Sequence, residues 1–188
     1  MIPQKRLPDE SFNDGQILSN QSERTISRVM KGLVKEEVQT PFGKFTYLWG
    51  RDQLLGEQAL LGVTTNALFK GIGDGCLSRS HIYSVREEMS NNGSFRQYVL
   101  NQIRRKHRIY RDMIRKSESS SSAWNIELSL DELIPYSQNI GNGFFLPIKV
   151  ADVLSYARIS EIDLENYMNN NEKSRLRPVE HGFLIQKH

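Results

Sequence analysis

The chain has 188 residues, of which 38% are hydrophobic and 25% charged, and its formal net charge is +3. No run approaches the roughly 18 apolar residues of a membrane span, and no apolar N-terminal segment predicts a secretory signal. The single cysteine excludes an internal disulfide and favours a reducing, cytoplasmic location. No Cys/His cluster has the spacing of a zinc site, so the sequence predicts no metal and no other cofactor.

The N-terminal quarter combines a polar leader with a predicted hairpin. Residues 1–21 contain two prolines, an Asn-Asp-Gly turn and no apolar period, which predicts a flexible leader. We expect residues 22–188 to form one domain. Ser22 is a candidate N-cap for a short first helix. The segment 36–49, with Pro-Phe-Gly at its centre, predicts a β-hairpin.

The middle of the chain is predicted to be helical. Short helical patterns cover 52–69, and a longer one covers 77–89, directly after a glycine-rich turn. The clearest helix is 94–116, where apolar residues from Phe95 to Ile114 form one stripe. Four consecutive serines then predict a connection.

The C-terminal third is predicted to contain most of the remaining strands. These strands are expected at 124–130, 140–146, 162–164 and 179–186, with one helix at 149–156. Helices in the middle and strands towards both ends are typical of an α+β domain, in which a small β-sheet packs between helices.

The most informative segment is Gly73-Asp74-Gly75-Cys76, which places the only cysteine at the start of the predicted helix 77–89. Free N–H groups and the macrodipole at a helix N-terminus stabilise a thiolate, which is the nucleophilic form. The glycines would let backbone N–H groups turn towards a carbonyl oxygen, as an oxyanion hole requires. Cys76 is therefore a candidate nucleophile. The alternative is an inert core thiol, because most free cysteines are buried.

The letters around Cys76 resemble a known motif. Asp74-Gly75-Cys76-Leu77 followed by Arg79-Ser80 is similar to the nucleophile motif of the ovarian-tumour (OTU) family of cysteine deubiquitinases, although one residue between Gly and Cys is missing. Two further segments, 143–157 and 178–185, resemble that family's Trp-Gly segment and its final, histidine-bearing strand. The resemblance implies a papain-like fold in which 22–65 is an extension or a rearranged segment.

A cysteine nucleophile needs a base, and histidine is the usual one. Three histidines are poorly placed for this role in the predicted elements: His81, His107 and His188. His181 remains, and it is also the position that the resemblance selects. The third catalytic group is Asp74 in this interpretation, with Asn166 and Glu180 as open alternatives.

The resemblance also implies a substrate. Cys76 would attack the carbonyl of the C-terminal glycine of ubiquitin or of a polyubiquitin chain, with His181 as general base. Backbone N–H groups of Gly73, Gly75 and Cys76 would hold the oxyanion. One source of such a domain is a bacterial effector that acts in the host cytoplasm.

A second interpretation rests on charge. Eight cations lie in the predicted helix 94–116: Arg96, Arg104, Arg105, Lys106, Arg108, Arg111, Arg115 and Lys116. A cationic helix attracts phosphates or acidic surfaces, so the alternative function is a non-enzymatic basic module that binds nucleic acid or an acidic partner through this helix. A solvated helix face is the plainer explanation. Because Tyr110 alone could stack on bases, the sequence favours the deubiquitinase and argues against nucleic acid.

Overall fold

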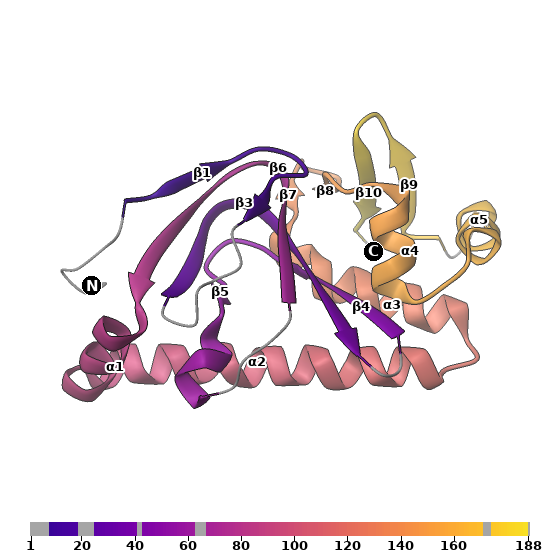
Figure 1. Cartoon of the computed structure of the whole chain (residues 1–188). Helices are drawn as coiled ribbons and strands as arrows, with labels where there is room; N and C mark the ends of the chain where they lie inside the picture. The colour runs from indigo at the N-terminus through magenta and orange to yellow at the C-terminus, as the bar shows by residue number, and fades with distance from the viewer. Residues whose placement is uncertain (1–7, 19–24, 41–42, 63–66, 171–173, 188) are drawn as a thin grey trace. The chain divides into compact units, whose positions relative to one another are not determined.

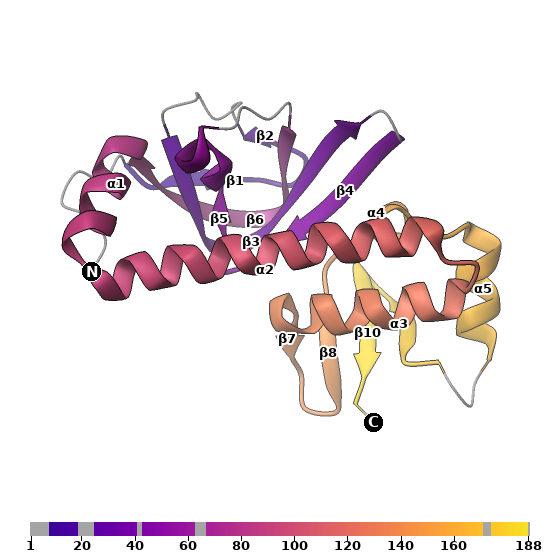
Figure 2. The same ribbon diagram turned by 90° about the horizontal axis from the view of Figure 1, so that it is seen from below.

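The computed structural model describes residues 8–18, 25–40, 43–62, 67–170 and 174–187. The chain divides into two compact units, Met1–Arg108 and Ile109–His188. Helix α2 (Gly93–Glu118) contains the boundary, and Figure 2 shows it as one continuous helix. The division expected at residue 21, between a leader and a single domain, stays a prediction.

Unit 1 is built on two long antiparallel strands, β3 (Thr25–Thr40) and β6 (Ala67–His81), which pair along most of their length. The sheet order is β1-β6-β3-β4, with β2 also on β6 and β5 on β3 (Figure 1). The shorter elements of unit 1 are β1 (Glu10–Phe12), β2 (Ile17–Leu18), β4 (Gly43–Trp49), β5 (Leu54–Leu55), the 3-10 helix η1 (Glu57–Leu61) and α1 (Ile82–Asn91).

The predicted hairpin over 36–49 is confirmed, because β3 and β4 pair on either side of residues 41–42. The helix expected after Ser22 is wrong for residues 25–40, which form β3, and Ser22 itself lies outside the described residues. Both faces of β3 carry buried residues and its register shifts between Val29 and Leu33, so its apolar spacing imitates a helical period. Within the expected leader, β1 and β2 pair with β6.

The described part of unit 2 combines the end of α2 and three further α-helices with a small antiparallel sheet of order β7-β8-β10-β9. Its elements after α2 are α3 (Ser122–Leu133), the 3-10 helix η2 (Ile134–Tyr136), β7 (Gln138–Asn139), β8 (Gly143–Leu146), α4 (Val150–Ala157), α5 (Glu161–Asn169), β9 (Leu176–Val179) and β10 (Gly182–Gln186). Among the described residues, no helix combines the length and apolar content needed to cross a bilayer.

Two predicted strands of unit 2 are helices. Residues 124–130 alternate apolar and polar letters, which predicted a strand, but they lie in α3, where Ile126, Leu130 and Leu133 are buried on one face. The strand expected at 162–164 lies in α5. The predicted helices 94–116 and 149–156 are confirmed by α2 and α4.

Candidate nucleic-acid interface

Cys76 does not lie at a helix N-terminus. It lies within β6, where its backbone pairs with Ser11 of β1 and Lys31 of β3. The following helix, α1, begins only at Ile82, because residues 77–81 continue the strand. The predicted helix dipole is therefore absent from the surroundings of the thiol, and this part of the prediction is wrong.

The glycines around Cys76 have a packing role. Phe12 of β1 is buried, and its ring packs against the glycines of β6. A Cβ on Gly71 or Gly75 would overlap that ring. Gly73 has a φ of 63°, and its N–H donates to the carboxylate of Asp14 at 3.1 Å. The close approach of β1 to β6 therefore explains why glycines are required in this segment. The predicted oxyanion hole has no support in this geometry.

The two main residues of the predicted catalytic set belong to different units. His181 lies in the turn between β9 and β10, has a φ of 64° and a side chain that is 84% exposed, and contacts Glu180 at 3.3 Å. Asp74 is exposed on β6, in the same strand as Cys76. The catalytic roles of Cys76, His181 and Asp74 thus stay predictions that the local geometry does not support. His188 lies outside the described residues.

In unit 2, α4 and α5 form a helix–turn–helix pair. Helix α4 ends at Ala157, and Arg158 adopts the left-handed conformation with a φ of 59°, donating its N–H to the carbonyl of Leu154. Three residues connect the two helices, which is the length typical of this motif. Both helices pack against α3, so the turn angle is fixed by a common support (Figure 1).

The start of α5 is fixed by a capping box. The hydroxyl of Ser160 accepts the N–H of Asp163 at 3.2 Å, and the Asp163 carboxylate accepts the N–H of Ser160 at 3.1 Å. Hydrogen bonds from Ser160 hold the pKa of Asp163 below its usual value. The helix therefore begins at one defined residue, which orients its first turn.

The end of α5 is connected to α3 by a partly buried hydrogen-bond network. The Tyr167 hydroxyl donates to the Glu127 carboxylate and accepts the N–H of Arg175 at 3.2 Å. The Arg175 guanidinium donates to Glu127 and to Asp131, both at 2.9 Å. Burial, followed by the bond to Glu127, raises the pKa of Tyr167 to about 12. These contacts also connect α5 to the segment that enters β9.

The outward face of α5 is polar and contains no cation. Leu164 and Tyr167 are the buried residues of this helix. The exposed residues are Glu161, Ile162, Glu165, Asn166 and Asn169. A hairpin of β9 and β10 follows in sequence and carries the exposed Arg177. A helix–turn–helix with a following β-hairpin is an arrangement that presents its second helix to the DNA major groove.

Sequence reasoning missed this site, although one local signal was present. Ser160 followed three residues later by Asp163 matches the start of a helix, and it stands directly ahead of residues that we assigned to a strand. In the segment Ile162-Asp163-Leu164, apolar and polar residues alternate, which is the pattern expected of a strand. The left-handed position in the turn is occupied by Arg158 and not by a glycine, so the turn carries no glycine signal in the sequence.

The interior of unit 1 contains a buried ion pair. Nζ of Lys106, on α2, lies 2.8 Å from Glu57 of η1, and both side chains are at most 3% exposed. The same ammonium lies 4.3 Å from the centre of the Trp49 ring, and the Trp49 indole donates to the buried Glu36 at 2.5 Å. Lys106 thus fills interior space and is neutralised by the protein itself.

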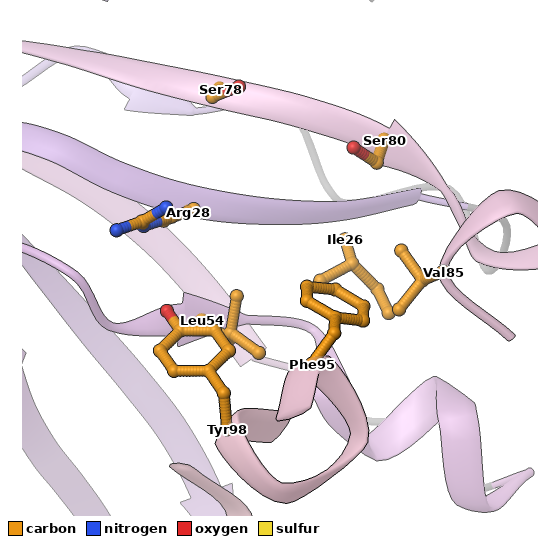
Figure 3. Close-up of a pocket in the computed structure, with 8 residues that line it drawn as sticks. All are labelled: Ile26, Arg28, Leu54, Ser78, Ser80, Val85, Phe95 and Tyr98. Atoms are coloured by element: carbon orange, nitrogen blue, oxygen red, sulfur yellow. The ribbon is translucent and has the colours of Figure 1, made fainter. Parts of the chain in front are cut away.

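A small cavity of about 30 Å³ lies elsewhere in unit 1, between the sheet and the start of α2 (Figure 3). Arg28, at its edge, donates to Asp52 at 2.5 Å and lies 5.7 Å from the centre of the Tyr98 ring. The Ser78 hydroxyl oxygen is buried and has no hydrogen-bond partner among the described residues. The volume accommodates about two water molecules.

Among the comparisons with known proteins, only the comparison of structures found similar proteins. No family model matches the sequence, and no curated protein is similar to it. The chain is similar in structure to FixK2 from Bradyrhizobium japonicum, with a TM-score of 0.76 and 10% identity over 96% of this chain and 92% of that one.

Two further solved structures agree. A cyclic nucleotide-binding domain containing protein from Listeria monocytogenes has a TM-score of 0.76 and 13% identity, over 97% of this chain and 90% of that one. A CRP/FNR-family transcriptional regulator from Thermus thermophilus has a TM-score of 0.68 and 16% identity, over 96% and 94%. The chain therefore has the fold of CRP/FNR-family proteins.

This finding corrects the interpretation based on the OTU resemblance. The papain-like α+β fold is wrong, because 96% of the chain matches solved structures with the antiparallel β-structure and helices of the CRP/FNR fold. The predictions of a cysteine deubiquitinase, of ubiquitin as partner and of a bacterial effector protease are wrong for the same reason. The alternative interpretation, a non-enzymatic binding module, agrees better with these neighbours.

Proposed function

We propose that this chain is a DNA-binding transcriptional regulator and that unit 2 binds DNA by placing α5 in the major groove. The observation that carries the proposal is the α4–turn–α5 pair, followed by the β9–β10 hairpin. In such motifs, residues near the start of the second helix contact base edges. The structural similarity to a protein described as a transcriptional regulator supports the same function. The proposal places the chain in the cytoplasm, with the DNA.

Three cations of unit 2 are suited to phosphate contacts. Lys149 precedes α4 and is exposed, Arg158 lies in the turn, and Arg177 is exposed on β9. The helix dipole adds partial positive charge at the start of α4. Such contacts fix the register of a protein on the duplex, whereas the side chains of α5 supply the contacts to bases.

Helix α2 contains the basic residues that the sequence suggested as a nucleic-acid surface, but two of its lysines stabilise the interior instead. Lys106 and Lys116 of α2 are fully buried and paired with Glu57 and Glu132. They therefore hold α2 in place and are removed from any surface. We assign DNA binding to α5 because a helix–turn–helix supplies a geometry for the groove, which a basic helix alone does not.

Two described cations of unit 1 argue against a cyclic nucleotide there, the ligand class named for one structural neighbour. Its phosphate needs a cation or a set of N–H donors. In the described part of unit 1, the fully buried Lys106 is neutralised by Glu57, and Arg28 is bonded to Asp52. The cavity of about 30 Å³ is also too small. We therefore assign no cyclic nucleotide to this unit.

The test is a fluorescence-anisotropy titration with the full chain, at several salt concentrations, of a duplex of about three helical turns that the full chain itself has selected from a randomised library. The wild type is expected to bind, with affinity falling as salt rises. Arg177→Ala should weaken binding to all sequences and lower the salt slope by about 1. The matched control is Arg96→Ala, an exposed arginine of unit 1, which should change neither quantity. A folded wild-type protein that binds no duplex at low salt would overturn the proposal.

A further inference from the structure

All nine residues of α5 are described, and none of them is Lys, Arg or His. Three are carboxylates, and two of these, Glu161 and Glu165, lie one turn apart on the exposed face. Asp163 is engaged in the capping box with Ser160. The exposed residues therefore present two carboxylates, the amides of Asn166 and Asn169, and the apolar side chain of Ile162, which is 69% exposed.

This face cannot turn inward without breaking the core of unit 2. Leu164 is 1% exposed and Tyr167 is 9% exposed. The Tyr167 hydroxyl is bound to Glu127 of α3 and to the N–H of Arg175. The carboxylates of Glu161 and Glu165 are therefore held outward, on the side that the proposed function places in the groove.

The chemistry of these side chains restricts the bases that they can contact. A carboxylate only accepts hydrogen bonds, and the donors in the major groove are cytosine N4 and adenine N6. Guanine presents the acceptors N7 and O6, which Arg or Lys usually contacts. An amide such as Asn166 pairs with adenine, and an apolar side chain such as Ile162 packs on the thymine methyl group. α5 contains no Arg or Lys, the residues that most commonly contact guanine.

The charge around this face also limits attraction to the phosphates. Within the described residues 149–170 and 174–187, five side chains are cationic: Lys149, Arg158, Arg175, Arg177 and Lys187. Five are anionic: Asp152, Glu161, Asp163, Glu165 and Glu180. Equal numbers give little sequence-independent attraction, which in most DNA-binding proteins comes from an excess of cations.

We infer that α5 selects DNA by its carboxylates, with Glu161 or Glu165 accepting from cytosine N4 and Asn166 pairing with adenine. The same carboxylates oppose binding to unrelated sequences. This inference rests on the proposed function and specifies its target. A cytosine contacted in this way has guanine on the opposite strand, but the guanine N7 takes no part.

The experiment is selection of bound duplexes from a randomised library by the full chain, in the wild type and in Glu161→Gln and Glu165→Gln. The wild type should enrich a cytosine–guanine pair, and the variant of the contacting glutamate should lose discrimination at that pair by roughly 5- to 150-fold. Both variants should bind unselected DNA more tightly. The matched control is Glu118→Gln, an exposed acid at the end of α2, which should change neither property.

Replacing the opposite guanine with 7-deazaguanine separates the two strands of the selected pair. The inference predicts unchanged affinity, because the carboxylate contacts cytosine. A large loss of affinity would show that a cation contacts guanine and would overturn the inference while DNA binding stands. Unchanged selectivity in both Gln variants would also overturn it. Absence of binding to every duplex by a folded protein would instead overturn the proposed function, and the inference with it.

Discussion

Lys106 in unit 1 and Lys116 in unit 2 lie on the same helix and have similar surroundings. Each ammonium pairs with a glutamate and lies over an aromatic ring, 4.3 Å from the centre of Trp49 and 4.4 Å from the centre of Tyr156. The glutamates differ, because Glu57 is 3% exposed and Glu132 is 11% exposed. Water can therefore reach Glu132 in unit 2, whereas the Lys106–Glu57 pair in unit 1 is shielded from water and is neutralised only by its own opposite charges.

The two units also differ in charge. Unit 1 has sixteen Lys and Arg against eleven Asp and Glu, whereas unit 2 has nine against eleven. The positive net charge of the chain thus resides outside the unit with the helix–turn–helix. Under the proposed function, DNA binding by unit 2 would therefore depend on specific contacts and on a few well-placed cations more than on overall electrostatic attraction.

The largest expected effect is that of Lys106→Met. This substitution leaves Glu57 buried without its partner, which should lower the free energy of unfolding by about 3–5 kcal/mol. Urea denaturation of the full chain measures the change. The double variant Lys106→Met with Glu57→Gln removes both charges and should recover most of the loss. A single variant as stable as the wild type would show that the pair does not stabilise unit 1.

Lys116→Met should have a smaller effect, since Glu132 can be hydrated. We expect a loss of about 2–3 kcal/mol, between that of a buried ion pair and that of an unsatisfied hydrogen bond. Burial lowers the pKa of Lys116 below 10.5, so protonated Lys116 already carries a desolvation cost in the folded protein. Urea denaturation of both variants tests whether Lys106→Met loses more stability than Lys116→Met. A loss larger than that of Lys106→Met would reverse the comparison of the two units.

Tyr167→Phe tests the network that positions α5. Loss of the hydrogen bond to the Glu127 carboxylate should cost about 1.5 kcal/mol at neutral pH. The pKa of Tyr167 is raised from 10.0 to about 12, so its stabilisation is complete below about pH 10 and is lost as the pH rises from about 10 to 12. The difference between wild type and variant should therefore narrow over that range. A constant difference would contradict the assigned pKa and its cause.

Ser160→Ala should have the smallest effect, about 1 kcal/mol, because it removes the N-cap of α5. Thermal unfolding of the full chain can measure this change, and Ser160→Asp, which retains an acceptor, should restore most of the stability. Equal stability of Ser160→Ala and the wild type would show that the capping box does not determine where α5 begins.

The sequence predicted the elements whose signals are local. The hairpin over 36–49 has a Pro-Phe-Gly turn, and the helices α2 and α4 have apolar stripes that follow a helical period. The pairing of β3 with β6 joins residues far apart in sequence, and bulges near Gly32 disturb the alternation of β3. No local pattern could have revealed it.

The site illustrates the same limit. The letters around Cys76 resemble a protease motif, but the glycines serve the packing of Phe12, which lies far earlier in the chain. The helix–turn–helix has no glycine in its turn and no arginine in its second helix, so neither conformation nor charge marked it. Only the Ser160–Asp163 capping box was a readable local signal.

The most direct test of the account places a benzoylphenylalanine photocrosslinker at position 162, on the exposed face of α5. The control carries it at position 83, since Tyr83 in α1 of unit 1 is 68% exposed. Irradiation of each full-length protein with the selected duplex should crosslink DNA from position 162 and not from position 83. Crosslinking from position 83 alone, with none from 162 in a protein that still binds, would contradict the placement of α5 in the major groove.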